Sequence, residues 1–524
     1  MKASENLKTS ERIGVPRDAR TESLWQQGIE HFTGESLVKF DPETVYDVVV
    51  AGGGITGLTA ALLLQKAGKK CVLAEAYTLG YGTTGGTTAH INTYVDTTYY
   101  QIEKDFGEEG ARLVAAATKE AISLIEELTI LHQIKSDFEY KQGYLYAETD
   151  EQADQLEKIF ESSVKAGVSV HLCNNVPVPV AFKKAVVYEG QAQIHPLKYI
   201  QGLAKEFVRE GGIILENCRI KAIESERDYH IALNDAHPIK AYKAIYATHI
   251  PPGINLLHFR NAPYRSYAIG VKLPEEKYPD ALVYDVQDPY HYFRTHTIEG
   301  EKYLILGGED HKTGHGDPSA AFRSLEEYAK KLYPAGSIEY GWSAQYFEPS
   351  DGLPYIGKLP GFSEGVFVAT GFSGNGITYG SIAGKILTDL IVNGSSKYEE
   401  IFDPGRIKPI AGFTEFVKEN ADVAYKFFAD RISTTEISTL EEIELDKGAV
   451  VDYKDQKLAV YKDAGGELHA LNPVCTHAKC IVHWNDSEKS WDCPCHGARY
   501  DINGQVLTGP ASRGLQRVEL FREL

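Results

Sequence analysis

The most regular hydrophobic pattern in the chain is a short β-branched run that leads into a glycine-rich turn. Residues 46–51 (YDVVVA) predict a buried parallel strand, and the apolar stretch 58–67 beyond the glycines predicts a helix. A second strand is expected over residues 70–74, and an acidic residue follows it. This order of strand, turn, helix and strand predicts an α/β domain built on a parallel sheet.

The middle of the chain mixes helical and β-rich patterns. Helices are expected over residues 110–130, 150–166 and 196–210, and strands over 242–247, 262–273 and 303–307. A last strand–loop–helix unit is expected over 366–392. We interpret this mixture as an α+β region interleaved with the α/β unit.

A change of pattern predicts a second domain. Residues 449–471 alternate apolar and polar positions between Gly/Asp turns, which is typical of successive hairpins. The expected parts are an N-terminal extension over 1–44, an α/β domain over 45–425 and an all-β domain over 436–524, with the boundary near residue 435. In the extension, an amphipathic patch is expected to pack on the rest of the protein; it consists of Leu24, Trp25, Ile29 and Phe32.

Composition and charge narrow the class of protein. The chain has 524 residues, of which 43% are hydrophobic and 24% charged, so several globular domains are expected. The formal net charge of −19 argues against nucleic acid and anionic lipid as partners. Neither a signal peptide nor an apolar span of about 20 residues is recognisable. The expected location is therefore the cytoplasm, with no membrane contact.

The glycines after the first strand follow the dinucleotide pattern Gly52-x-Gly54-x-x-Gly57. The first glycine permits a tight turn, the second lets the backbone approach a pyrophosphate, and the third brings helix and strand together. Glu75, at the end of the second strand, is placed to accept hydrogen bonds from a ribose. Because the whole strand–turn–helix–strand context is present, a nucleotide site is favoured over a glycine-rich turn that only packs.

Further segments resemble the D-amino acid oxidase and glycine oxidase-like flavoprotein family, in the family's order. They are GYGTTGGTTAHIN (80–92), QAQIHPLKYI (191–200), KAIYATHI (243–250), DGLPYIG (351–357) and GVFVATGFSGNGITYGSIAGKILTDLI (365–391). The resemblance implies FAD, a Rossmann-like FAD-binding domain and an interleaved α+β substrate domain. The implied cofactor-binding residues are Gly52, Gly54, Ile55, Thr56, Gly57, Glu75, Ala76, Gly82, Thr83, Thr84, Thr87, Thr88, Ala89, Ile220, Ala247, Thr248, Gly374, Asn375, Gly376, Ile377 and Thr378.

The last of these segments opens a helix with Gly371, Gly374 and Gly376, which leaves backbone N–H groups unpaired at its start. In folds of this kind that helix end faces the N1–C2=O edge of the flavin, where a positive helix end stabilises the reduced form. The alternative is a strand-to-helix turn that only packs.

One departure from the family concerns the substrate. Members that act on α-amino acids hold the carboxylate with an Arg just before the D-G-x-P-x-I-G segment, but Tyr346 stands about there in this chain. Loss of that bidentate cation disfavours a simple amino acid. Catalytic residues are otherwise unknown, and the pocket candidates are His90, His291, Arg294 and Tyr346, whose alternative role is packing.

The C-terminal part contains Cys475-x-His477 and Cys493-x-x-His496, separated by 15 residues. Two Cys and two His suit a tetrahedral zinc ion. The two loops also resemble Rieske proteins, in which two thiolates hold one iron of a [2Fe–2S] cluster and two imidazoles the other. That resemblance implies a disulfide between Cys480 and Cys495, and a third loop at Gly509-Pro510.

Ala498 replaces a Ser that donates a hydrogen bond to the cluster in high-potential Rieske proteins, while Tyr500 is kept. The midpoint potential is therefore expected below the top of the range of roughly −150 to +300 mV.

The combined sites predict an FAD-dependent oxidoreductase that oxidises a small amine- or imino-acid-like molecule and passes electrons through the cluster to an external acceptor. The cluster's imidazoles are expected near the protein surface, where a partner protein can approach. Two alternatives stay open: a reductase that receives electrons from a donor protein through the cluster, and a redox sensor without turnover. Covalent attachment of FAD and the oligomeric state are left open as well.

Overall fold

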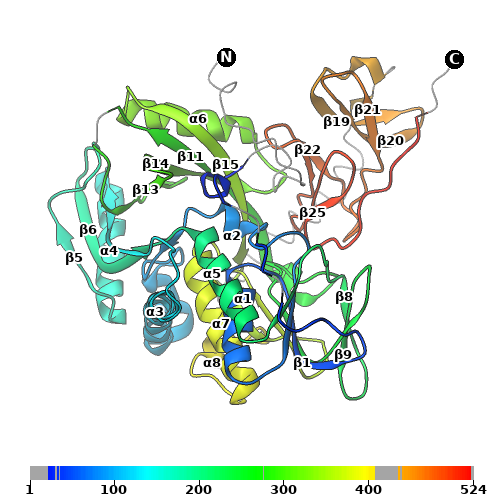
Figure 1. Ribbon diagram of the computed structural model, residues 1–524. Coiled ribbons are helices and arrows are strands. Elements are labelled where there is room, and N and C mark those ends of the chain that lie inside the picture. The colour runs from blue at the N-terminus through cyan, green and yellow to red at the C-terminus, as the bar shows by residue number, and fades with distance from the viewer. Residues whose placement is uncertain are drawn as a thin grey trace.

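The computed structural model describes residues 22–29, 32–34, 36–274, 277–407, 435–436 and 440–520. Figure 1 shows a large α/β body and, beside it, a smaller all-β part formed by the C-terminal residues. The predicted end of the first domain at residue 425 and most of the predicted N-terminal extension lie outside the described residues.

The first sheet contains the predicted dinucleotide unit. Its main strand order is β16-β17-β10-β1-β2-β7, and the neighbours of β1 run parallel to it. Helix α1 follows β1 directly, and α7 packs against α1 so closely that a Cβ on Gly384 would lie 2.7 Å from Thr59. The elements are β1 (Val45–Ala51), α1 (Ile55–Lys66), β2 (Cys71–Ala74), α5 (Pro196–Arg209), β7 (Ile213–Leu215), β8 (Ala222–Ser225), β9 (His230–Leu233), β10 (Ile239–Tyr246), β16 (Tyr355–Lys358), β17 (Val366–Thr370), α7 (Gly376–Val392) and α8 (Glu399–Phe402).

The second sheet has the order β15-β11-β14-β13-β12-β4-β6-β3, with β5 paired to β6. Most neighbours are antiparallel, and only β12 and β4 are parallel among the pairs of this sheet in the described chain. Its elements, with the helices around it, are α2 (Thr83–Gly86), β3 (His90–Ile91), α3 (Tyr99–Leu131), β4 (Glu139–Ala147), α4 (Asp150–Ala166), β5 (Val170–Cys173), β6 (Lys184–Gln193), η3 (Leu256–Arg260), β11 (Asn261–Lys272), β12 (Leu282–Asp285), β13 (His291–Ile298), β14 (Glu301–Lys312), α6 (Pro318–Leu332) and β15 (Ser337–Pro349).

Two helices compare the predicted bounds with the observed ones. Helix α4 has the predicted bounds, because Thr149 caps its start and Gly167 ends it in the left-handed conformation. Helix α3 begins at Tyr99, before the predicted start at residue 110. The residue responsible is Gly107, whose φ of 80° breaks the helical geometry, so that two helical segments meet there.

The described residues of the C-terminal part form two four-stranded sheets, and β19, β20 and β21 pair as the hairpins that the sequence pattern predicts. The first contains β18 (Thr435–Glu436), β19 (Lys447–Tyr453), β20 (Gln456–Lys462) and β21 (Leu468–Leu471), and η4 (Leu440–Glu442) precedes β19. The second contains β22 (His483–Asn485), β23 (Ser490–Asp492), β24 (Arg499–Tyr500) and β25 (Val506–Thr508).

The N-terminal segment packs on the body through η2 (Leu24–Gln26). Leu24 and Trp25 are fully buried, as their amphipathic pattern predicts. None of the helices in the described part of the chain combines the length and apolar character that a membrane span requires.

Candidate functional site

The glycine-rich turn after β1 has no room for side chains. Gly52 has a φ of 112°, and a Cβ there would lie 2.3 Å from the carbonyl oxygen of Ala247. A Cβ on Gly57 would lie 1.9 Å from the carbonyl oxygen of Gly52. The turn and the start of α1 therefore depend on glycine, which suits a backbone that approaches a pyrophosphate closely.

Glu75 follows β2 and lies on the wall of the same cavity as the turn. Its carboxylate accepts hydrogen bonds from the Gly53 N–H at 2.7 Å and the Tyr77 N–H at 2.9 Å. Burial raises the pKa of Glu75, although these two hydrogen bonds oppose the shift. This position, at the carboxyl end of the second strand, suits the predicted contact with a ribose diol.

The cavity has a volume of about 430 Å³ and gathers most of the residues predicted to bind FAD. They are Gly52, Gly54, Ile55, Thr56, Glu75, Ala76, Gly82, Thr83, Thr84, Thr87, Thr88, Ile220, Ala247, Thr248, Gly374, Asn375, Gly376 and Ile377. The lining set does not include Gly57, Ala89 or Thr378. Gly57 packs on the turn, Ala89 accepts a hydrogen bond from Arg294, and the hydroxyl of Thr378 accepts one from the Asn92 N–H at 3.1 Å.

The loop over residues 82–88 is supported from behind by large side chains. The Trp25 indole N–H donates to the Thr87 carbonyl at 2.5 Å, and that of Trp342 donates to the Gly86 carbonyl at 2.9 Å. The guanidinium of Arg294 donates to the carbonyls of Thr88 and Ala89, each at 2.8 Å. Arg294 is fully buried and is not among the cavity-lining residues, so for this candidate the contacts favour the alternative role in packing.

The start of α7 differs from the prediction in one contact. The N–H of Gly374 is not left unpaired, because it donates to the carboxylate of Asp96 at 2.6 Å. The side chain of Asn375 makes no capping hydrogen bond to the helix and instead accepts from the Asp96 N–H at 2.9 Å. Gly374 and Gly376 both line the cavity, so this helix end still faces the space where the cofactor fits.

The other pocket candidates separate into two groups. His90 and Tyr346 line the cavity, whereas His291 does not. The imidazole of His291 contacts the Asp285 carboxylate at 2.9 Å and stacks on Tyr328 at 4.0 Å between ring centroids. Burial opposes protonation, but the bond to Asp285 raises the pKa of His291, which is held as a structural ion pair.

Several cavity residues were not found from the sequence. Asp96 and five tyrosines (Tyr94, Tyr284, Tyr290, Tyr292 and Tyr346) line the part below the second sheet; only Tyr346 was predicted. Arg219 and Tyr77 lie near Glu75, where the Arg219 guanidinium is 4.9 Å from the Tyr77 ring centroid. Tyr94 follows β3, and the other four tyrosines lie on β12, β13 and β15 or just before β13, so only the folded topology brings them together.

The C-terminal motif forms two loops with the same hydrogen-bond pattern. In the first, the N–H of Cys475 donates to the Cys480 carbonyl at 2.8 Å and Lys479 donates back to Cys475 at 3.1 Å. In the second, Cys493 donates to the Ala498 carbonyl at 2.8 Å and Gly497 donates back to Cys493 at 3.0 Å. Each loop therefore presents one cysteine and one histidine in an equivalent setting.

The four predicted ligands meet at the ends of these loops. Cys475 and Cys493 are buried, and the rings of His477 and His496 lie 5.0 Å apart at an angle of 85°. The Nδ1 atoms of both histidines are buried and have no hydrogen-bond partner in the described chain. Two thiols together with two unpartnered imidazole nitrogens suit a metal centre, and they fit the donor set of a Rieske cluster.

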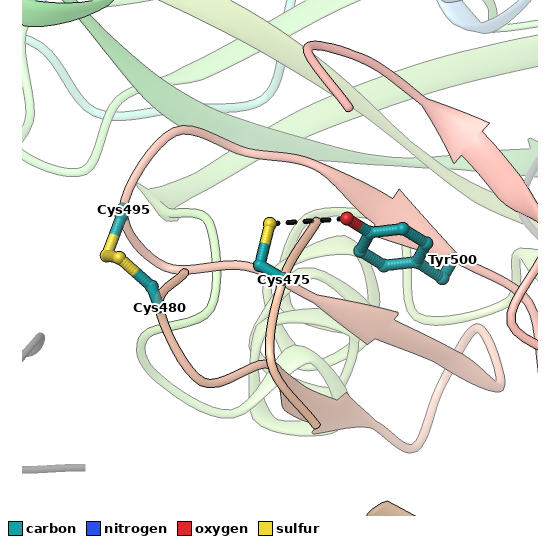
Figure 2. Close-up of a disulfide and its surroundings, with 4 residues drawn as sticks. All are labelled: Cys475, Cys480, Cys495 and Tyr500. Atoms are coloured by element: carbon teal, nitrogen blue, oxygen red, sulfur yellow. Dashed lines mark hydrogen bonds between the residues drawn. A yellow bond between two sulfur atoms is a disulfide. The ribbon is translucent and has the colours of Figure 1, made fainter. Parts of the chain in front are cut away.

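Figure 2 shows the disulfide beside the predicted ligand Cys475. The hydroxyl of Tyr500 lies 3.2 Å from its sulfur, and Cys480 and Cys495 form a disulfide that links the two loops. The sulfurs of Cys480, Cys493 and Cys495 lie within 4.8 Å of one another. Hydrogen bonding with Cys493, assisted by Tyr500, lowers the pKa of Cys475, which favours a thiolate ligand.

The imidazole edges of this site are covered by the α/β body. The Nε2 atom of His477 lies 3.0 Å from the Gly253 carbonyl oxygen and 3.2 Å from Nδ1 of His258. The ring of Phe259 lies 6.0 Å from that of His496. Only 8% of His477 and 6% of His496 is exposed, so the expectation that these imidazoles lie at the protein surface is wrong.

A buried ion pair joins the two parts of the molecule. Glu488, in the turn between β22 and β23, accepts hydrogen bonds from Arg265 of β11 at 2.6 and 2.7 Å and also pairs with Arg499. Gln345 of β15 donates to the Gly497 carbonyl at 2.9 Å. Residues 507–509, 511 and 512 then complete the wall of the cavity that the dinucleotide turn begins.

Comparisons with known proteins agree with this geometry. Residues 47–390 match the family model for FAD dependent oxidoreductases (DAO), and residues 434–519 match that for the Rieske [2Fe-2S] domain. The Bacillus subtilis (strain 168) protein YhfW, whose name describes a Rieske 2Fe-2S iron-sulfur protein, is 33% identical over 488 residues, covering 93% of this chain and 96% of YhfW. Gamma-glutamylputrescine oxidoreductase of Escherichia coli (strain K12) is 25% identical, covering 67% of this chain and 85% of that protein.

Among solved structures, glycine oxidase from Geobacillus kaustophilus superposes with a TM-score of 0.58 at 19% identity, over 69% of this chain and 99% of that one. L-proline dehydrogenase from P. horikoshii gives 0.57 at 21% identity, over 69% and 97%. These likenesses concern the fold. From the family match, the chain belongs to the FAD-dependent oxidoreductases of the DAO family, with an FAD-binding domain and a C-terminal Rieske domain that binds a [2Fe–2S] cluster.

Proposed function

We propose that this protein is a dehydrogenase whose FAD domain oxidises a small amine- or imino-acid-like substrate and whose Rieske domain passes the electrons to an external one-electron acceptor. Bound FAD supplies two-electron chemistry, whereas a Rieske cluster carries electrons one at a time. The observation that carries the proposal is the shared wall: Thr508, Gly509 and Ala511 of the Rieske domain line the same cavity as the dinucleotide turn.

The residues of the FAD domain have separate tasks. Gly52, Gly54 and the start of α1 offer backbone N–H groups to the pyrophosphate, and Glu75 accepts from the ribose. The start of α7, with Gly374 and Gly376, lies on the same cavity. The second sheet covers the remaining side with tyrosines, which limits the access of water to the reacting groups.

The interface keeps the cluster loops directed at the FAD domain. His477 is held by the Gly253 carbonyl, and Gly497 by the side chain of Gln345. The ion pair between Arg265 and Glu488 is buried on both sides, with at most 1% of either side chain exposed. Joining the domains in one chain also raises their effective concentration to about millimolar or more.

The substrate class rests on the cavity and on one relative. Tyr346 lines the cavity, about where amino-acid oxidases carry the Arg that holds a carboxylate. The relative from Escherichia coli is named for gamma-glutamylputrescine, which contains an amino group. Both observations support an amine more than a simple amino acid.

The test is anaerobic mixing of the FAD- and cluster-loaded protein with a panel of primary amines, secondary amines and imino acids. We expect the flavin absorbance to bleach and the low-average-g EPR signal of the reduced Rieske cluster to follow. In Cys493→Ser the bleaching should remain without that EPR signal. A wild-type cluster that stays oxidised after complete bleaching would contradict the proposed route.

The same experiment separates the reverse direction of electron flow. If no member of the panel bleaches the flavin, but a reduced ferredoxin-type donor reduces the cluster and the flavin is then bleached, the protein is a reductase. The Cys493→Ser variant should then lose flavin reduction by the donor.

A further inference from the structure

The part of the cavity below the second sheet forms a chamber, defined here by Tyr94, Tyr284, Tyr290, Tyr292 and Tyr346. All five side chains line the cavity. Their rings lie close to one another, with 5.5 Å between the centroids of Tyr94 and Tyr284 and 5.8 Å between those of Tyr290 and Tyr292. Tyrosine faces carry negative charge density, so a chamber of this composition attracts cations.

Asp285 lines the cavity but is bound to His291, so two other carboxylates matter at the chamber, one on its wall and one behind it. Asp96 lies on its wall, beside Gly374 and the hydroxyl of Tyr290. Asp310 lies behind Tyr346 and accepts that residue's O–H at 2.9 Å. Within the described chain, the second carboxylate oxygen of Asp310 is buried without a hydrogen-bond partner.

Burial makes the charged forms of both carboxylates unfavourable. It raises the pKa of Asp96 to about 6, against the opposing effect of the Gly374 N–H, and the pKa of Asp310 to about 7, against nearby hydroxyls such as those of Ser266 and Tyr346. Two desolvated carboxylates near one another gain most from a positive charge that enters the space between them.

In the described chain, no cationic side chain acts on either carboxylate. The buried Arg294 lies near Tyr284, but it is bound to the carbonyls of Thr88 and Ala89. Among the described cavity-lining residues, only Arg219 and Arg499 carry a fixed positive charge. Arg219 contacts Tyr77 and donates to the Val506 carbonyl at 3.1 Å, and Arg499 is bound to Asp492 at 3.0 Å and to Glu488. The two histidines on the wall are neutral, because burial lowers the pKa of His90 far below its usual value and that of His249 to about 4.

From this arrangement we infer that the substrate is a protonated amine with no carboxylate beside its reacting C–N bond, selected by Asp96 and by Tyr346. Asp310 is a positioning residue, because it acts through the hydroxyl of Tyr346. The ammonium group is matched by tyrosine faces and two carboxylates. An α-amino acid would bring its own carboxylate towards Asp96 without a cation to offset the repulsion.

This inference rests on the proposed function, since it specifies the substrate of the same FAD domain. It is tested with three probes of one carbon skeleton: n-butylamine, 1-butanol and norvaline, which is butylamine with a carboxylate on the reacting carbon. Each is titrated anaerobically into the FAD- and cluster-loaded protein, and the shift or bleaching of the flavin absorbance gives the dissociation constant. We expect butylamine to bind about tenfold more tightly than either other probe.

Three variants assign the selectivity to residues. Asp96→Asn and Asp310→Asn keep the shape of the side chain and remove its charge, and Tyr346→Phe removes the link to Asp310. Each should weaken butylamine about tenfold while 1-butanol stays unchanged, a difference that a merely structural role would not produce. Asp280→Asn is the matched control, because Asp280 is exposed and pairs with Lys141 away from the cavity.

Binding of norvaline as tight as that of butylamine would overturn the inference. So would an unchanged butylamine constant in both Asp96→Asn and Asp310→Asn, or the lack of any flavin response specific to butylamine. The proposed electron route can fail separately. If butylamine binds to the protein or bleaches the flavin but the EPR signal of the reduced cluster does not appear, the route fails and this inference stands. If norvaline bleaches the flavin and reduces the cluster, the electron route stands and the inferred substrate selectivity fails.

Discussion

The two cofactor sites of this chain are assembled over very different stretches of sequence. The predicted cluster ligands Cys475, His477, Cys493 and His496 fall on two loops of one small domain. The wall of the FAD cavity includes residues from Ala51 to Ile377, and the Rieske domain contributes its last part. The first site consists of side chains that bind metal, whereas much of the second is backbone around glycines such as Gly52 and Gly54.

This difference explains how each site responds to change. A cluster ligand cannot be replaced without loss of a bond to iron, so single substitutions there have complete effects. The FAD cavity spreads its contacts over many residues, and a single change removes only a part. The interface belongs to both, because it closes the cavity and covers the cluster's imidazoles.

Cys493→Ser is expected to destroy the cluster site and to leave the FAD cavity intact. We expect complete loss of the [2Fe–2S] cluster with FAD retained, because Cys493 supplies one of only two thiolates. The measurement is the iron and flavin content of the purified variant, together with its EPR spectrum after dithionite reduction. Cys173→Ser is the control, since Cys173 lies in β5, outside the cluster loops. An intact Rieske EPR signal in Cys493→Ser would exclude Cys493 as a ligand.

Glu488→Gln removes the buried ion pair that joins the Rieske domain to the FAD domain. Glu488 is fully buried between Arg265 and Arg499, so neutralising it leaves two guanidinium groups without their shared anion. We expect the free energy of unfolding of the Rieske domain to fall by about 3–5 kcal/mol. The measurement is a urea titration of the loaded protein, followed by the visible circular dichroism of the cluster.

The control at the same interface is Ser319→Ala. Ser319 contacts the Ser487 hydroxyl at 2.8 Å in a part-buried, neutral hydrogen bond, whose loss is expected to change stability by about 1 kcal/mol or less. Equal effects of Glu488→Gln and Ser319→Ala would show that the ion pair does not hold the domains together.

The contrast between the sites also sets what the sequence could predict. The cluster ligands could be predicted directly, because thiol and imidazole side chains at fixed spacing carry the chemistry themselves. The dinucleotide turn was found because Gly52, Gly54 and Gly57 stand between a strand and a helix. Asp96 and Tyr290 gave no such indication, since they reach the cavity only through the topology of the second sheet.

Two residues show why the sequence could not place every side chain. The sequence left open whether Arg294 lines the pocket or packs, and the fold directs it to the carbonyls of Thr88 and Ala89. His477 was expected near the surface, where a partner protein can approach, but the η3 region with His258 covers it. Local patterns predict much of the secondary structure and the four side chains that meet at the cluster loops. Contacts between segments far apart in sequence depend on packing that no local pattern records.

Gly57→Ala tests the FAD cavity at the dinucleotide turn. A Cβ at Gly57 would lie 1.9 Å from the backbone oxygen of Gly52, so the helix must move away from the turn. We expect FAD affinity to fall about tenfold or more, equivalent to about 1.4 kcal/mol, while the cluster is kept. Flavin released on dilution of the loaded protein measures the effect. Gly465→Ala is the control, because its Cβ would meet only the Asp463 carboxylate at 3.3 Å; equal FAD release from both variants would contradict the role of Gly57.

The smallest expected effect is a change in the midpoint potential of the cluster, compared at two positions beside the cluster site, Ala498 and Tyr500. Ala498 is buried in the same core as Cys475 and Cys493, and Tyr500 already lies 3.2 Å from the Cys475 sulfur. A donor to sulfur stabilises the more negative reduced cluster, so Ala498→Ser should raise the midpoint potential and Tyr500→Phe should lower it. A hydrogen bond of about 0.5–1.5 kcal/mol corresponds to shifts of about 20–60 mV in this one-electron couple. EPR-monitored redox titrations of both variants measure the shifts, and an unchanged or lower potential in Ala498→Ser would mean that the missing hydroxyl does not set the potential.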